Sequence, residues 1–275
     1  DARDWNNCGC VVPHNRKTGE WTAAVNMNFG SALEYALNQG ASLMTGKKMG
    51  LDEKPAAEMT SFEEVKAAFY RQFDNLCRHS VILTVEAQRL HREMVPRPFL
   101  SSCNEHCLET GRDLSHGGAQ YNIGPVITGI GLAVVANSLA AIQKLVFEEH
   151  RCDMATLAKA LQANWNGYEE LRAAAKAAPK YGNDDDRVDG IAREIANHFY
   201  DEIHQYHDIF GSPFLTAFMG ISNYIPMGRV LGATPDGRCA GEPSSEGVSP
   251  YVGTDVSTPL AAMRSAAKLN QDVHS

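Results

Sequence analysis

The spacing of apolar residues predicts one long amphipathic helix in the first third of the chain. From Ser61 onward, apolar side chains recur at three- and four-residue steps as far as Val85 and Leu90, which is the period of a helix with one buried face. Ser61, followed by Glu64 three residues later, matches a capping box at the helix start. Pro96 cannot continue the pattern, so the helix is predicted to run from Ser61 to just before Pro96.

Shorter helices are predicted along much of the rest of the chain. The stretch 31–40 begins with Ser31, has Glu34 three residues on and ends with Gly40, which favours a capped helix with Ser31 at its N-cap. Residues 130–147 are apolar on nearly all sides, which is typical of a buried helix. The same periodicity predicts helices over 154–163, 165–178 and 188–206, and a last one after Pro259.

Strands and loops are predicted where this periodicity is absent. The composition of 22–29, 97–103 and 214–223 favours strands. Residues 1–21, 111–124 and 232–253 are rich in turn-forming residues and are predicted to be loops. The first of these loops holds the most unusual residue pattern in the sequence.

Composition and charge exclude several classes of protein. The 275 residues are 44% hydrophobic and carry a net charge of −8 with a pI near 5.7, which disfavours binding to nucleic-acid phosphates. Polar residues interrupt the most apolar stretch, 128–147, so no membrane span is expected. An odd number of cysteines without dense, even spacing favours a reduced, cytoplasmic compartment. Because the N-terminus has neither a methionine nor a signal pattern, we expect the chain to begin within a longer protein.

The segment Cys8-Gly9-Cys10 is the main candidate for chemistry. Its glycine has no side chain, which allows a ligand to approach the backbone closely. A loop cysteine can serve as a thiolate nucleophile, a metal ligand or a hydrogen-atom relay, and the spacing alone selects none of these roles or a purely structural one. His14, four residues after Cys10, is the one histidine that also falls in this loop.

Other chemistries find less support in the sequence. The intervals within 8–10 and 103–107 do not match the paired Cys-x2-Cys pattern of a zinc site. A cysteine hydrolase would need a base beside Cys10, and the spacing to His14 does not establish such a pair. The glycines at 117–118 and 129–131 do not complete a phosphate-binding motif. The acidic run 184–186 is interpreted as an N-cap with first-turn carboxylates.

Several segments together resemble the glycyl radical enzymes of the pyruvate formate-lyase type, and they occur in the family's order. They are GCV at 9–11, ALEYALN at 32–38, GAQYN at 118–122, NSLAAIQKLVF at 137–147, PKYGND at 179–184 and ATPDGRCAGEP at 233–243. The resemblance implies a helix-rich α/β fold, namely the second half of a ten-stranded α/β barrel. Residues 1–275 then form a partial barrel domain, without the first half-barrel and the C-terminal glycyl radical domain.

The same resemblance implies a radical mechanism. Cys10 matches the family's active-site cysteine, whose thiyl radical abstracts a hydrogen atom from a small organic substrate. The radical begins on a glycine within an Arg-Val-x-Gly-Tyr-like motif, which is absent from this sequence. A radical S-adenosylmethionine activating enzyme installs it, so that enzyme is an expected partner, and no cofactor is expected to bind this chain directly. A homodimer and an anaerobic, cytoplasmic setting are expected on the same ground.

The residues around Cys10 depart from the family in a way that bears on the substrate. Many of its lyases carry a glutamate two residues after the cysteine, where this chain has Val12. The branch that decarboxylates 4-hydroxyphenylacetate has a second glutamate at a place that aligns loosely with Thr128. Without these carboxylates, the sequence favours a radical decarboxylase of an arylacetate such as phenylacetate or indoleacetate. Val12 and Thr128 are then predicted to contact the substrate, with His14 as a polar or carboxylate contact.

Two alternatives remain open at this point. One is a glycyl radical dehydratase or eliminase that cleaves a C–O, C–N or C–S bond with a displaced base. The other is an inert structural or partner-binding paralogue. Taken alone, the fragment is expected to be inactive, because it lacks the radical glycine.

Overall fold

The computed structural model describes residues 5–8, 12–15, 19–21 and 24–271. Its central feature is a parallel sheet with strand order β4-β6-β7, and the strands are β4 (Ala24–Asn28), β6 (Val126–Ile130) and β7 (Leu215–Ala217). Two smaller sheets are formed by strands that precede β4 or β6 in the chain. An antiparallel ribbon joins β1 (Trp5–Cys8) to β2 (Val12–Asn15), and β3 (Gly19–Trp21) pairs in parallel with β5 (Tyr121–Ile123).

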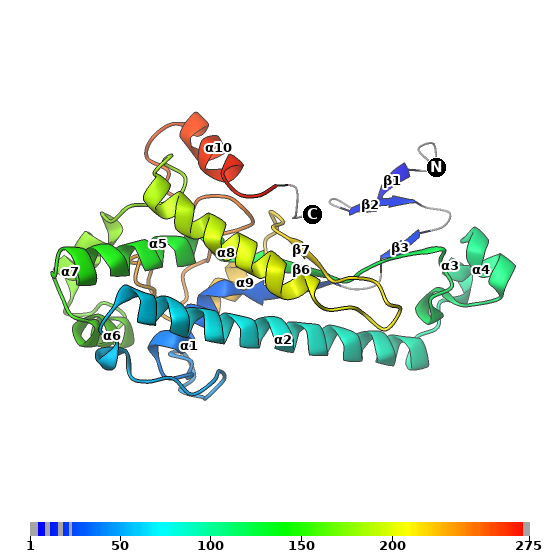
Figure 1. Cartoon of the computed structure of the whole chain (residues 1–275), viewed down its shortest axis with the longest axis horizontal. Helices are drawn as coiled ribbons and strands as arrows, with labels where there is room; N and C mark the ends of the chain where they lie inside the picture. Colours follow the sequence, from blue (N-terminus) through cyan, green and yellow to red (C-terminus); the bar gives the residue numbers. More distant parts are fainter. Residues whose placement is uncertain (1–4, 9–11, 16–18, 22–23, 272–275) are drawn as a thin grey trace.

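Helices contribute far more residues than strands to the described chain, and several of them pack against this sheet (Figure 1). The first group is α1 (Phe29–Leu37), α2 (Phe62–Met94), α3 (Pro98–Ser101) and α4 (Glu105–Thr110). The second is α5 (Leu132–Ile142), α6 (Met154–Gln162), α7 (Glu169–Lys176), α8 (Asp186–His204), α9 (Tyr224–Arg229) and α10 (Pro259–Ala267). Short turns are η1 (Ala56–Glu58) and η2 (Leu114–His116), and a π-helical segment, η3 (Gln143–Glu148), continues α5.

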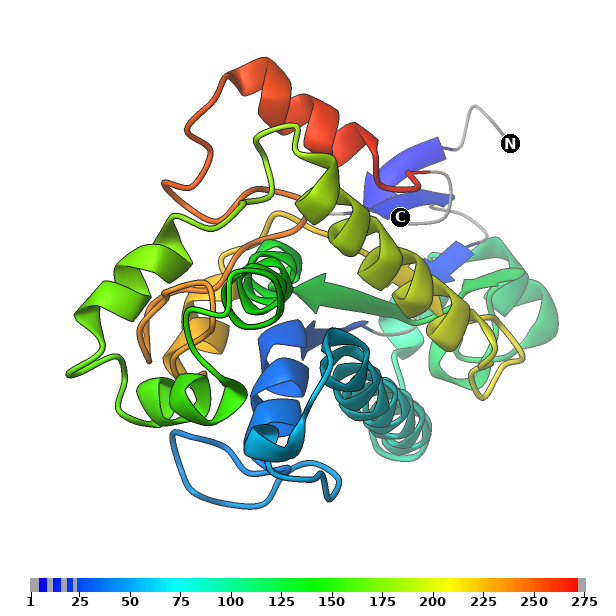
Figure 2. The same ribbon diagram turned by 60° about the vertical axis from the view of Figure 1, so that its left-hand side comes forward.

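The hydrophobic core lies between the sheet and helices α1, α2, α5 and α8. Figure 2 shows α1 and α2 together beside the sheet, with α5 and α8 packed close to it. Phe29 meets Phe73 edge-on at 4.7 Å between ring centroids and Phe199 at 5.0 Å. All three rings are fully buried. Because such aromatic pairs add to the gain from apolar burial, they hold α1 between α2 and α8.

Local sequence explains the longest helix. The Ser61 hydroxyl accepts a hydrogen bond from the Glu64 amide at 3.2 Å, which confirms the predicted start of α2. Glu64 itself reaches back to the Thr60 amide. The helix ends at Met94, before Pro96, as predicted. Within the described residues, no helix has the length and apolar character needed to cross a membrane.

Several local predictions were wrong. The stretches 1–21 and 111–124, predicted to be loops, contain the strands β1, β2, β3 and β5. Ser31 does not cap α1, which begins at Phe29 after Asn28; because β4 runs directly into this helix, the strand position fixes its start. The stretch 97–103 is the short helix α3 rather than a strand, since Pro98 occupies its first turn. The predicted strand at 214–223 is limited to Leu215–Ala217.

A single buried arginine organises the loop between α9 and residue 243. The Arg238 side chain is 2% exposed, and its guanidinium donates hydrogen bonds to five backbone carbonyls. These carbonyls belong to Gly228, Leu231, Gly232, Glu242 and Pro243. Since a loop of this kind has no sheet or helix to satisfy its carbonyl groups, Arg238 takes over that task.

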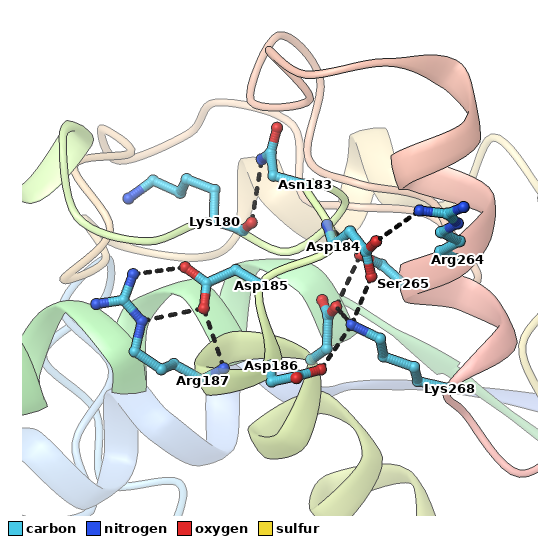
Figure 3. A network of polar contacts seen from close by, with 10 residues as sticks. Lys180, Asn183, Asp184, Asp185, Asp186, Arg187, Arg264, Ser265 and Lys268 are labelled. Carbon is cyan, nitrogen blue, oxygen red and sulfur yellow. Dashed lines mark hydrogen bonds and ion pairs between the residues drawn. The ribbon is translucent and has the colours of Figure 1, made fainter.

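The acidic run 184–186 joins two helices (Figure 3). Asp185 caps α8 by accepting from the Arg187 amide, which confirms its predicted N-cap role. Lys268, just after α10, contacts Asp184 at 2.7 Å and Asp186 and Asp189 at 2.8 Å each. The Asp189 side chain is fully buried, so Lys268 neutralises a charge that is costly to leave unpaired.

We expect the substitution Lys268→Met to loosen α10. Asp189 would keep only the Ser265 hydroxyl, at 2.9 Å, as a described partner, and amide hydrogen exchange in α10 should rise at least about tenfold. Lys159→Met, at an exposed lysine of α6, is the matched control and should leave exchange unchanged. Equal exchange in both variants would contradict this role.

The same contacts predict loosening of α10 in acid. The hydrogen bond from Lys268 and the ion pair with Arg264 hold the pKa of Asp184 below its ordinary value. A carboxyl with a lowered folded-state pKa contributes stability that is present above its unfolded pKa and lost as pH falls through the folded one. Protection of the α10 amides, corrected for their slower intrinsic exchange in acid, should therefore fall below about pH 4, and less so in Lys268→Met.

Candidate functional site

The two faces of the β4-β6-β7 sheet differ in chemistry. Met27 of β4 and Ile127 of β6 belong to the hydrophobic core, and the space beside Gly129 is filled by Phe29 and Phe218. Because side chains alternate along a strand, Asn26 and Thr128 lie on the opposite face. The same alternation places Ala24, Val126, Ile130, Leu215 and Ala217 on that face. We call its polar positions, Asn26, Asn28 and Thr128, the polar face of the sheet.

The strand register places Asn26 and Thr128 of the polar face side by side on neighbouring strands. Asn26 pairs with Thr128, and Thr128 pairs with Ala217, across the three strands. Thr128 is fully buried, yet its hydroxyl has no hydrogen-bond partner among the described residues. A buried hydroxyl without a partner costs free energy in the isolated chain, so it marks a place where a ligand or a further segment would gain a hydrogen bond.

The carboxyl-terminal edge of the sheet adds another unpartnered oxygen. The Asn28 amide nitrogen donates to the Met227 carbonyl at 3.1 Å, while its amide oxygen is buried without a hydrogen-bond partner in the part of the chain that the structure describes. Nearby, Gly131 has a φ of +97°, and a Cβ there would lie 2.9 Å from the Ser244 hydroxyl oxygen and 3.8 Å from the Asn28 oxygen. Gly131 thus allows α5 to begin close to this edge.

The sequence-predicted site residues fall on different parts of the structure. Cys10 lies outside the described residues. In the sequence it falls between β1 and β2, and the paired residues of these strands nearest to it in sequence are Cys8 and Val12. The backbone of His14 pairs with Asn6 in the same ribbon, and the side chains of Val12 and His14 also lie outside the described part. Thr128 is on the separate β4-β6-β7 sheet. All four assignments therefore stay predictions.

Sequence reasoning missed Asn26 and Asn28. The signal was present, because the two asparagines alternate with Val25 and Met27 in a segment predicted to be a strand. Alternation indicates that one face is polar, but it does not tell which strand lies alongside.

Three of the cysteines that the structure describes are poor candidates for thiolate chemistry. Burial raises the pKa of the Cys77 thiol strongly, and it also raises the pKa of Cys107 and of Cys152. A thiol that stays protonated is a weak nucleophile and a weak metal ligand. Across the described ranges, no three His, Cys, Asp or Glu side chains are placed to share a metal ion.

Comparisons with known proteins agree on one family. Residues 1–228 match the family model described as pyruvate formate lyase-like. Trans-4-hydroxy-L-proline dehydratase of Clostridioides difficile is 34% identical over 271 residues, covering 98% of this chain and 34% of the relative. Indoleacetate decarboxylase of Tractidigestivibacter scatoligenes is 31% identical over 296 residues, covering 98% and 33%. The chain therefore spans about a third of the length of these relatives.

A solved structure shows the same fold. The glycerol-bound form of the B12-independent glycerol dehydratase from Clostridium butyricum superposes with a TM-score of 0.92 at 36% identity, over 99% of this chain and 34% of that one. The predicted resemblance and the helix-rich α/β fold of this type are confirmed.

Proposed function

This chain belongs to the pyruvate formate lyase-like family, and on that premise we propose that the protein containing it is a glycyl radical lyase acting on a small, polar organic substrate. The proposed reaction is elimination, with water as the first leaving group to test. Cys10 carries the hydrogen-atom relay, and the 275 residues supply part of a larger barrel domain.

The polar face of the sheet supports a polar substrate. The Thr128 hydroxyl and the Asn28 amide oxygen are buried without hydrogen-bond partners within the described residues, and Asn26 lies beside Thr128 in the register. An aryl ring placed there would leave these groups unpaired, whereas a hydroxylated or aminated substrate would pair with them. This observation places elimination ahead of the arylacetate decarboxylation that the sequence favoured.

The proposed chemistry divides the work between Cys10 and neutral polar groups. A glycyl radical, when installed, would supply the acceptor for the Cys10 hydrogen atom. The Cys10 thiyl then forms an S–H bond as a substrate C–H bond breaks. The substrate radical loses its hydroxyl group and a proton as water, and the thiol finally returns its hydrogen atom to the product radical.

Proton transfer needs a group that the polar face does not contain. Asn26 and Thr128 are neutral and can orient a hydroxyl, but they cannot accept its proton at neutral pH. Val12 replaces the carboxylate that the resemblance would place near Cys10. We therefore place the general acid or base of an eliminase on another part of the full-length protein.

Product analysis tests the reaction class. The full-length protein, activated without oxygen by a competent activating enzyme, is offered glycerol, propane-1,2-diol, trans-4-hydroxyproline and arylacetates in separate assays. An aldehyde or a dehydrated imino acid is expected. Carbon dioxide with a methylarene would instead establish decarboxylation, and a stable radical signal without any of these products would contradict both.

Arylacetate decarboxylation is the second candidate, and two observations favour it. Val12 stands where many eliminases of the family carry glutamate, and one relative of this chain is an indoleacetate decarboxylase. An inert paralogue is the third reading. Failure to form any radical after treatment with a competent activating enzyme would favour it.

The substitution Thr128→Val should separate a substrate contact from a packing role. Valine keeps the shape but removes the unpartnered hydroxyl, so the free energy of unfolding should stay equal or rise slightly. Loss of a substrate hydrogen bond should raise KM or lower kcat/KM about tenfold. Unchanged kinetics with unchanged stability would contradict a substrate contact at Thr128.

The partners and setting follow from the same proposal. We propose a radical S-adenosylmethionine enzyme as the activating partner, a homodimer as the assembly and the cytoplasm as the location. Gel filtration of the full-length protein tests the dimer, since a monomer at micromolar concentration would exclude a tight one.

A further inference from the structure

A second polar site lies between two loops near the C-terminal end of the chain. A cavity of about 560 Å³ is bordered by residues 176–185 and 236–256. This volume is in the range of small-molecule sites. No residue of β4, β6 or β7 lines it, so the proposed function makes no use of this cavity.

Two oppositely charged side chains border the cavity although both are buried. Lys180 is 9% exposed and Asp236 is 3% exposed. Burial lowers the pKa of Lys180 to about 8, and the charge of Asp236 opposes that shift. Burial also raises the pKa of Asp236, opposed by the Thr234 hydrogen bond and by Lys180. Burying a charge costs free energy unless an opposite charge or hydrogen bonds compensate for it. A ligand that supplied such interactions would therefore stabilise both groups.

Each of these groups keeps hydrogen-bonding capacity unused. The Lys180 ammonium donates to the carbonyls of Ala175 at 2.7 Å and Ala178 at 3.2 Å, which uses two of its three donors. One Asp236 oxygen accepts from the Thr234 hydroxyl and the Arg238 amide. The other oxygen accepts no hydrogen bond within residues 24–271. In Figure 3 the Lys180 side chain extends away from Lys268 and its aspartate partners.

Two further polar groups, Tyr251 and Glu242, also line the cavity. Tyr251 is half-buried, and its hydroxyl forms no hydrogen bond within the described residues. Burial raises its pKa to about 12, with smaller contributions from the charges of Glu242 and Asp236, which places the phenol near both carboxylates. The cavity therefore offers donors on Lys180 and Tyr251 and carboxylates on Asp236 and Glu242. Further charged residues of both signs also line it, namely Lys176, Asp185 and Arg238.

We propose that this cavity binds a small zwitterion of the α-amino-acid class. The carboxylate of such a ligand would accept from Lys180 and Tyr251, and its ammonium group would donate to Asp236 and Glu242. A simple anion would satisfy the donors but face the carboxylates, and a simple cation would face the lysines. A ligand with both charges matches a lining that contains groups of both signs.

Calorimetric titration of the purified protein tests this proposal. L-alanine is the probe, with acetate and ethylammonium as ligands that carry one charge each. Saturable binding of alanine to one site is expected, with affinity at least about tenfold above either single-charge ligand. No saturable binding, or acetate binding as tightly as alanine, would overturn the zwitterion assignment.

Variants locate the binding in this cavity. Lys180→Met should weaken alanine binding at least about tenfold, whereas Lys159→Met, at an exposed lysine outside the lining, should not. Because Lys180 also bonds two carbonyls, Tyr251→Phe provides a variant that removes only an unbonded hydroxyl, and it should weaken binding severalfold. Unchanged affinity in Tyr251→Phe and Lys180→Met would place the ligand elsewhere and overturn the proposal.

Discussion

Replacing Cys10 with serine is expected to abolish turnover by the activated full-length protein, by a factor of at least about 10³. Serine has nearly the shape of cysteine, but its O–H bond is much stronger than an S–H bond. A radical therefore cannot be relayed through it to a substrate C–H bond. The glycyl radical signal should still form, because Cys10 acts after that radical is installed.

A neighbouring cysteine provides the control for this experiment. Cys8→Ser changes a thiol two residues away in the same segment, and the resemblance assigns the relay to Cys10 alone. Turnover in Cys8→Ser should stay within a few-fold of the unmodified protein. Full activity in Cys10→Ser would refute the assignment. Loss of activity only in Cys8→Ser would show that the family's active-site cysteine aligns with Cys8 and not with Cys10.

The second large effect is expected on the stability of the fold. Arg238→Met keeps a long side chain but removes the donors for five backbone carbonyls in the 228–243 loop. We expect the free energy of unfolding to fall by about 4 kcal/mol, because the carbonyls of Gly232, Glu242 and Pro243 would lose their donor. The other two carbonyls keep a backbone amide donor. For a chain of this size that corresponds to a Tm lower by about 10 °C.

Arg229→Met is the matched control for Arg238. Arg229 is an exposed residue at the end of α9, so its replacement should change the free energy of unfolding by less than about 0.5 kcal/mol. Thermal and urea unfolding of both variants measures the difference. Equal stability of the two would mean that water replaces the guanidinium without cost.

Elements with strong local signals were predictable from the sequence. The helix α2 was predicted because its apolar period continues over about eight turns and Ser61 bonds the Glu64 amide within the same turn. The helix α10 has a comparable signal, since Thr258 accepts from the Ala261 amide and Pro259 starts the helix. In both cases the residues that decide the boundary lie within four positions of each other.

Where the local signal competed with distant contacts, prediction failed. Ser31 and Glu34 looked like a capping box, but the Glu34 carboxylate instead accepts from the amides of Leu43 at 3.1 Å and Gly232 at 3.0 Å. Gly232 is almost 200 positions away in sequence. Burial raises the pKa of Glu34, so the hydrogen bonds from these two segments compensate for a group that the fold has placed inside.

The sequence by itself determined the family, the positions of the main helices and the position of the cysteine segment, because these depend on residue identity and short-range spacing. Only the tertiary structure decided that Asn26 and Thr128, about a hundred residues apart, pair across two strands, and that Lys180 and Asp236 border one cavity. Strand pairing and burial of charge depend on which segments meet in space, and neither short-range periodicity nor capping signals carry that information.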